Sequence, residues 1–158
     1  MSERSYGFRA TATFTPAAAA YSANDVISVA QELAGIGPIS GGEVMITAAS
    51  LLISETALQA SEASYTLHLY SVTPPSAHAD NAAWDLPSGD RASYLGYVTL
   101  GTPVDIGSSL WIQTDKINSV FTVPASAAGG SLFGELVTAA GFTATATARK
   151  VTLHGVWL

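Results

Sequence analysis

The sequence predicts an all-β protein, built as one antiparallel β-sandwich or jelly-roll-like domain over residues 1–158. Apolar and polar residues alternate with period two in most segments that could be regular, as they do in half-buried strands. Turn signals recur about every 8–12 residues, which is typical of sandwiches and jelly rolls. Strand patterns do not alternate with helical ones, so a parallel sheet is not expected. The length of 158 residues suits a single domain.

The first expected strand lies within residues 6–15. Phe8, Ala10, Ala12 and Phe14 fall on one face of it, and Arg9 and the threonines fall on the other. Pro16 and a short alanine run follow, and four alanines are too few to nucleate a helix. Residues 1–20 are therefore expected to form an N-terminal arm or an edge strand.

The middle of the chain contains three expected strands, at residues 26–29, 44–54 and 65–72. A glycine-rich loop at residues 35–42 separates the first two, and residues 57–63 are compatible with a short helical turn. In the third strand Tyr65, Leu67 and Leu69 alternate with Thr66, His68 and Tyr70, and Pro74-Pro75 ends it. Residues 73–91 then form the longest irregular segment. A loop of this length in a compact domain is usually functional or packed on itself.

Short strands are expected in quick succession after this loop, at residues 94–100, 110–114, 119–123, 131–138 and 150–158. A turn at residues 115–118 is expected to separate two of them. In the last strand Val151, Leu153 and Gly155 share one face, and this strand is expected to close the core.

Composition excludes several classes of protein. Residues are 48% hydrophobic, which excludes a disordered chain, and only 11% are charged, against about 25% in an ordinary domain. A net charge of −6 with two lysines and four arginines argues against nucleic-acid binding, because phosphate contacts need clustered cations. No cysteine is present, so disulfides and thiolate chemistry are excluded. The sequence shows no apolar run long enough to span a membrane and no signal peptide at residues 1–9.

Motifs for catalysis or metal binding are weak. His68, His78 and His154 are scattered along the sequence, whereas a metal site needs two or three of them to converge. The simpler interpretation is that they are hydrogen-bonded or partly exposed strand residues. Asp80, Asp85 and Asp90 suggest calcium, but their spacing fits no EF-hand, and Asx turns explain them equally well. No nucleophile elbow and no phosphate-binding glycine loop occurs. The sequence therefore predicts no enzyme, no catalytic residue, no cofactor and no metal ligand.

The tryptophans leave carbohydrate or partner binding open as a function. Trp111 and Trp157 lie in strands, where tryptophan is usually part of the core. Trp84 lies in the long loop, where it is either a plug over the core or an anchor for a partner. The plug is the preferred interpretation, but aromatic residues could also form a platform for carbohydrate.

The sequence resembles a known group of proteins over nearly its whole length. The opening SYGFRATATFTP and AYSANDVIS, the central PPSAHADNAAWDLPSGDRASYLGYVTLG and the ending KVTLHGVWL are similar to small virion structural proteins of tailed bacteriophages. Within that group the size and β character look most like a capsid decoration (cement) protein. The resemblance brings no catalytic motif with it.

This resemblance implies a non-enzymatic protein on the capsid exterior that binds the major capsid protein and stabilises the assembled shell. A mean hydropathy of +0.32 indicates apolar surface that one subunit cannot bury, so a homo-oligomer is expected, most simply a trimer on local three-fold axes. No nucleic acid and no membrane is expected as a partner. The alternative is a head-fibre or tail/spike β-module that binds host-surface glycans, and an exposed aromatic cluster around Trp84 would favour it.

Overall fold

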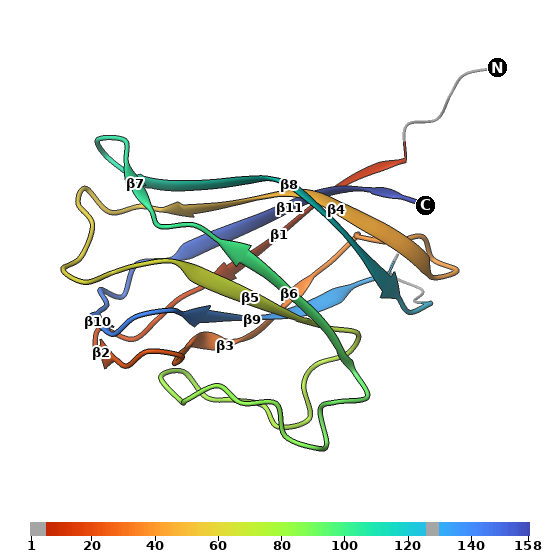
Figure 1. Ribbon diagram of the computed structural model, residues 1–158, viewed down its shortest axis with the longest axis horizontal. Coiled ribbons are helices and arrows are strands. Elements are labelled where there is room, and N and C mark those ends of the chain that lie inside the picture. The colour runs from red at the N-terminus through yellow and green to blue at the C-terminus, as the bar shows by residue number, and fades with distance from the viewer. Residues whose placement is uncertain (1–5, 126–129) are drawn as a thin grey trace.

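The computed structural model describes residues 6–125 and 130–158, and these form two packed antiparallel sheets with no helix (Figure 1). None of the described residues forms a helix that could cross a membrane. The strands are β1 (Gly7–Phe14), β2 (Ala20–Tyr21), β3 (Val26–Leu33), β4 (Gly42–Ile53), β5 (Tyr65–Tyr70), β6 (Tyr94–Leu100), β7 (Val104–Asp105), β8 (Leu110–Val123), β9 (Leu132–Thr138), β10 (Phe142–Thr143) and β11 (Arg149–Trp157).

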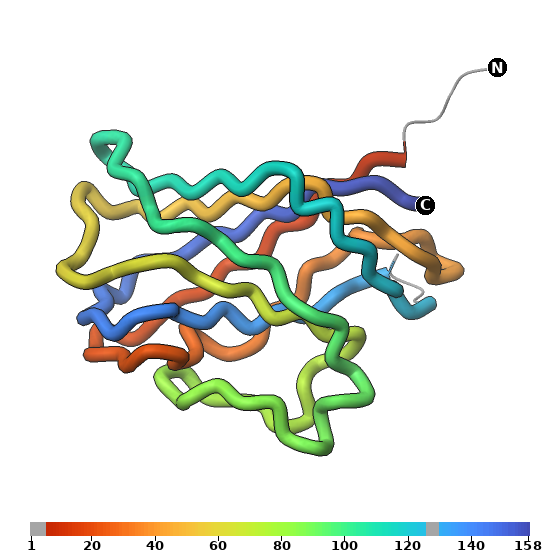
Figure 2. Tube along the Cα trace, viewed as in Figure 1, coloured from red at the N-terminus to blue at the C-terminus, as the bar shows by residue number. Residues whose placement is uncertain are grey.

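The strand order is that of a jelly roll. One sheet runs β1-β11-β4-β8-β7, the other runs β3-β9-β5-β6, and β2 pairs with β10 beside them. Apart from the three two-residue strands, successive strands pair from the outside inwards: β1 with β11, β3 with β9, β4 with β8 and β5 with β6. The chain is thus one long hairpin wound into two sheets, a path that Figure 2 traces by colour. The predicted fold class, an antiparallel β-sandwich of jelly-roll type, is confirmed.

The core lies between the sheets, where the inward residues of both interdigitate. The inward face predicted for β1 is confirmed, because Phe8, Ala10, Ala12 and Phe14 are at most 8% exposed. β11 is a central strand between β1 and β4, and it carries Val151 and Leu153 into the core. Gly155 lies at a register shift in this strand, where a Cβ atom would come 2.2 Å from the Met45 carbonyl oxygen. This position therefore requires glycine.

Three local predictions differ from the structure. Residues 115–118 are not a turn but a bulge inside one continuous strand, β8, where Lys116 and Asn118 adopt positive φ and the pairing with β4 shifts. Residues 57–63 contain no helical turn. β3 extends to Leu33, well past the predicted end at residue 29. β1 lies at one edge of the five-stranded sheet, and residues 1–5 of the expected arm lie outside the described residues.

Candidate functional site

The long loop between β5 and β6, residues 71–93, folds over the outer face of the four-stranded sheet (Figure 1). Alternation along β5 turns Tyr65, Leu67 and Leu69 into the core, so Thr66, His68 and Tyr70 face this loop. His68 lies opposite Glu135 of β9 on one side and opposite Tyr97 of β6 on the other. The loop thus encloses a polar and aromatic layer outside the core.

Asp80 fastens the loop to the N-terminal part of the chain. Its carboxylate accepts hydrogen bonds from the backbone N–H groups of Ala17 and Ser28 and from the Tyr21 hydroxyl, at 2.6–2.8 Å. The backbone adds a short ladder, in which Trp84 N–H donates to the Asn24 carbonyl at 2.8 Å. A loop with this many fixed backbone and side-chain contacts is a built structure rather than a loose connection.

Glu135 is the buried charge under the loop, with a fully buried side chain. Its carboxylate accepts hydrogen bonds from the Tyr70 hydroxyl at 3.0 Å and from the Trp84 indole N–H at 3.1 Å. His78 Nδ1 lies 3.1 Å from the same carboxylate, and its Nε2 lies 3.0 Å from the exposed carboxylate of Asp85. Both ring nitrogens therefore face acceptors, which is the arrangement of a doubly protonated imidazolium. Burial alone would lower the pKa of His78, but the hydrogen bonds and charges of Asp85 and Glu135 outweigh it and raise the pKa.

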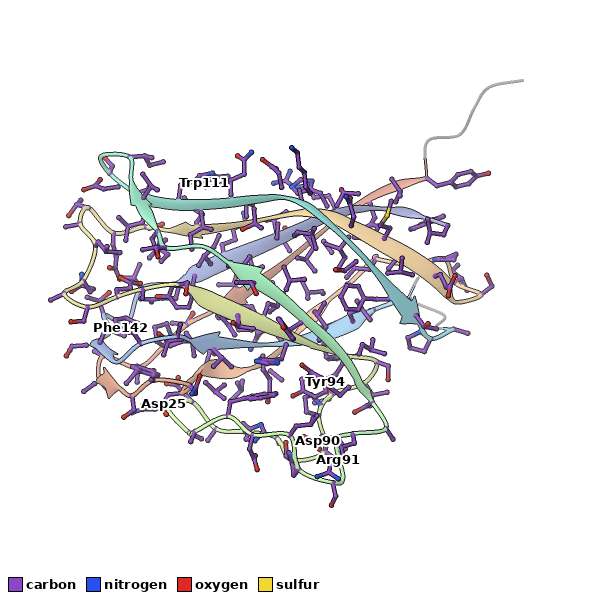
Figure 3. All side chains as sticks on the ribbon, in the orientation of Figure 1. Asp25, Asp90, Arg91, Tyr94, Trp111 and Phe142 are labelled. Carbon is purple, nitrogen blue, oxygen red and sulfur yellow. The ribbon has the colours of Figure 1, made fainter. Side chains whose placement is uncertain are left out.

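Trp84 covers His68. Their ring centroids are 3.7 Å apart with planes inclined by 17°, and His68 Nδ1 lies 3.0 Å from the Tyr94 hydroxyl. Figure 3 labels Tyr94 at the start of β6, beside the loop that carries Asp90 and Arg91. Burial lowers the pKa of His68 to about 4, so the ring under Trp84 is neutral at physiological pH. Trp84 packs inwards, as the plug interpretation expected, but it covers the outer face of a sheet and a buried glutamate rather than the core between the sheets.

A cleft of about 310 Å³ opens beside this stack. Trp84, His68 and Tyr97 supply aromatic walls, and Tyr97 is 59% exposed. Of the remaining lining residues, Asn24, Thr66 and Thr138 carry amide or hydroxyl groups, and Val137 and Ala139 are apolar. The cleft thus combines aromatic surface with neutral polar groups and contains no aspartate, glutamate, lysine or arginine.

The three loop aspartates are used separately, each with its own protein donors. Asp80 binds the N-terminal segment, Asp85 pairs with His78, and Asp90 accepts from the backbone N–H and hydroxyl of Ser76. Within residues 6–125 and 130–158 no three histidine, aspartate or glutamate side chains converge as metal ligands would. The Asx-turn interpretation is wrong for these three carboxylates, because each accepts from residues at least seven positions away in the chain rather than from its own turn. Independence from calcium stays a prediction.

A second hollow, of about 270 Å³, lies over the outer face of the five-stranded sheet. Trp111 forms part of it together with Arg9, Asp115 and His154. The expectation that Trp111 is a core residue is wrong, because Leu110 and Ile112 point inwards and turn Trp111 to the outside (Figure 3). Trp157 does pack against the core, and its indole N–H donates to the Ile36 carbonyl at 2.7 Å.

At another position in the sandwich, Arg149 is fully buried against two carboxylates. Its Nη2 lies 3.2 Å from Glu62 and 3.9 Å from Glu55, and its Nε donates to the Tyr65 hydroxyl at 3.1 Å. Burial opposes its charge, but Tyr65, Glu62 and Glu55 outweigh that and raise the pKa of Arg149. This arrangement is a buried ion-pair cluster that holds the chain around β5, β11 and the segment between β4 and β5.

The sequence analysis missed Glu135 and Arg149, although a signal for the first was present. Glu135 is the charged residue in the otherwise apolar strand LFGELV, and a charge at such a position is stable only if it finds partners. Those partners come from residues 70, 78 and 84, and no spacing rule connects them to residue 135.

Comparison with known proteins gives only distant similarities. No family model matches the sequence, and no curated protein sequence matches it closely enough to count as a relative. Among solved structures, the tomato aspermy virus structure is similar over 100% of this chain and 81% of its own, with 9% identity and a TM-score of 0.34. The cyanophage Pam1 capsid structure is similar over 98% of this chain and 86% of its own, with 9% identity and a TM-score of 0.32.

The third example is not viral. The core of a Drosophila protein, NLP, whose structure concerns pentamer formation and histone binding, matches 95% of this chain and 96% of its own, with 8% identity and a TM-score of 0.32. Similarities this low carry no argument about function, and the jelly-roll assignment here depends on the strand order itself.

Proposed function

We propose that this chain is a non-enzymatic structural component of a tailed-phage virion, a decoration protein that binds the assembled capsid shell from outside and stabilises it. The observation that carries the proposal is the sequence resemblance over nearly the whole length. The jelly-roll order is consistent with it, since viral capsid proteins often use this fold, although fold alone does not specify function.

The outer face of the five-stranded sheet is the surface we propose to face the shell. Its central rows carry small side chains such as Ala48, Ser50 and Thr152, and the hollow of about 270 Å³ opens over Ala48 and Ser50. Val104 and Val120, on the same face, are 62% and 51% exposed. Exposed apolar residues on this sheet face suit a contact that is mainly apolar rather than ionic.

A trimer suits this role. Closed symmetry buries apolar surface without leaving open edges, and a three-fold assembly matches the local three-fold axes of an icosahedral shell. Binding that occurs only on the assembled shell stabilises it by mass action, and three linked contacts add through multivalency. The major capsid protein is the proposed partner.

The test is to add the purified protein to expanded heads that lack it. We expect saturable binding that survives about 1 M salt, where the Debye length is about 3 Å, and heads that resist heat better once decorated. In solution, light scattering should give about 49 kDa, three times the 16.2 kDa chain mass.

Val104→Arg with Val120→Arg should abolish binding, because it places two cations in the proposed contact. Val72→Arg, at a 49% exposed position in the long loop, is the matched control and should leave binding intact. The decoration role would be refuted if the protein does not bind heads, or if it is found only at the tail tip.

The glycan-binding alternative is favoured by a different observation, the aromatic cleft beside Trp84. A head-fibre or tail module would need this cleft and would be present in few copies per particle. Counting copies per virion by mass spectrometry separates the two roles, since a decoration protein is present in hundreds.

A further inference from the structure

We propose that the cleft formed by Trp84, His68 and Tyr97 is a binding site for a neutral carbohydrate, whatever position the chain occupies on a particle. The site lies on the outer face of the four-stranded sheet, whereas the proposed shell-facing surface lies on the outer face of the other sheet. One copy of this protein can therefore bind the capsid shell and a carbohydrate at the same time.

The lining selects a ligand without charge. None of the described residues that line the cleft is an acid, a lysine or an arginine, and His68 stays neutral because it is buried under Trp84. An anionic or cationic ligand would lose its hydration here without gaining a counter-charge. The chemistry thus favours a molecule that is polar but uncharged.

The polar groups in the cleft are suited to hydroxyls. Among the described residues, the side chains of Asn24, Thr66 and Tyr97 make no hydrogen bond to other protein groups, although all three line the cleft. An amide and two hydroxyls can each donate and accept, as sugar hydroxyls do. The exposed ring of Tyr97 offers its negative face to the C–H bonds of a sugar ring, and Trp84 adds a second aromatic wall.

A peptide partner is less suited to this position. Most of the cleft lies over β5 and β9, and both strands are paired on each side, so their backbone cannot bind another strand. Only β6, which carries Tyr97, is an edge strand of this sheet. Recognition over β5 and β9 therefore comes mainly from side chains, as in many small-ligand sites.

The walls are fixed before any ligand arrives. The Trp84 indole N–H donates to Glu135 and Tyr70, its backbone N–H donates to Asn24, and one of its faces is stacked on His68. A ligand that enters this cleft does not have to order the loop first, and such preorganisation favours binding.

The experiment is a titration of the full chain with neutral oligosaccharides, namely maltoheptaose, cellohexaose, laminarihexaose and mannohexaose, followed by NMR. Binding of at least one with a Kd below roughly 1 mM is expected. The three tryptophans give three indole N–H signals, and the sugar should shift that of Trp84 while leaving those of Trp111 and Trp157 in place.

Variants then test the assignment. Tyr97→Ala should weaken binding about tenfold or more, and Thr66→Val, which keeps the side-chain shape, should weaken it about threefold to tenfold. Val120→Ala on the opposite sheet is the control and should leave the Kd for the sugar unchanged. Circular dichroism and the melting temperature establish that each variant is folded.

Three outcomes would overturn the proposal: no binding of any of these sugars at 10 mM, which is about ten times the expected Kd; binding that Tyr97→Ala does not affect; or a shift at Trp111 instead of Trp84. Tighter binding of polygalacturonate or of a proline-rich peptide than of the neutral sugars would also overturn it. None of these results depends on binding to heads, so the decoration role and the carbohydrate site fail or survive separately.

Discussion

Glu62 and Glu135 are both buried carboxylates, but the cations that compensate them differ in chemistry. Glu62 faces Arg149, a guanidinium that is charged at every physiological pH and is itself fully buried. Glu135 faces His78, a titratable ring that belongs to the long loop and lies beside the exposed Asp85. The cation of the first arrangement keeps its charge across the physiological pH range, whereas in the second the attachment of the loop depends on the proton that His78 carries.

The comparison also concerns position in the fold. Arg149 begins a central strand, β11, and contacts residues that precede and begin β5, so its cluster ties distant parts of the chain together. His78 joins one loop to the outer face of one sheet. Loss of the first should therefore affect the whole fold, and loss of the second should affect the loop and the cleft beside it.

The largest effect is expected for Arg149→Met. It leaves Glu62 and Glu55 buried without a cation, and removing one partner of a buried pair costs about 3–5 kcal/mol in the free energy of unfolding. Urea denaturation measures it. Lys150→Met, at the exposed neighbouring position, is the control and should stay within about 0.5 kcal/mol. Adding Glu62→Gln to Arg149→Met should recover part of the loss, and no recovery would contradict the charge explanation.

A smaller effect is expected for His78→Ala. Glu135 then keeps only two neutral donors, Tyr70 and Trp84, and an under-compensated buried group costs about 1–3 kcal/mol. Asp85→Asn removes the other partner of His78, but that side chain is 74% exposed, so a loss below about 1 kcal/mol is expected. Denaturation of both variants at pH 6 tests the difference. Equal losses would mean that the buried carboxylate is not what His78 stabilises.

A third effect is expected in the dependence of the unfolding free energy on pH. Because the pKa of His78 is raised in the folded protein, its contribution is complete below about 6.5, the unfolded value, and is lost as the pH rises through the raised pKa. The pKa of His68 is lowered to about 4, so the folded state loses stability as the pH falls from about 6.5 towards 4. The two histidines should therefore give a maximum near pH 6.5.

Unfolding free energies measured from pH 4 to pH 9 test this maximum. His78→Ala should flatten the alkaline side, and His68→Gln should flatten the acidic side. Lys150→Met serves again as the unrelated control and should keep both slopes. An alkaline slope that persists without His78 would show that another group titrates there.

Period-two alternation was enough to find most strands, because a strand with one face in the core must repeat every two residues. It identified the inward faces of β1, β5 and β11 correctly. It failed at residues 115–118, where the polar residues and positive φ values of a turn occur in a bulge. A bulge and a turn use the same backbone conformations, and only the pairing with β4 distinguishes them.

The sequence by itself determined the fold class, the inward faces of the strands and the place of the long loop, since these follow from local alternation and from proline and glycine. Only the tertiary structure decided how the loop is used. Glu135, Tyr70, His78 and Trp84 meet because β9 and β5 pair and the loop folds back over them. Contacts between residues 51 to 65 positions apart are set by strand pairing and packing, which no local pattern records. The same holds for Arg149 and Glu62, which lie 87 positions apart in the chain and 3.2 Å apart in the fold.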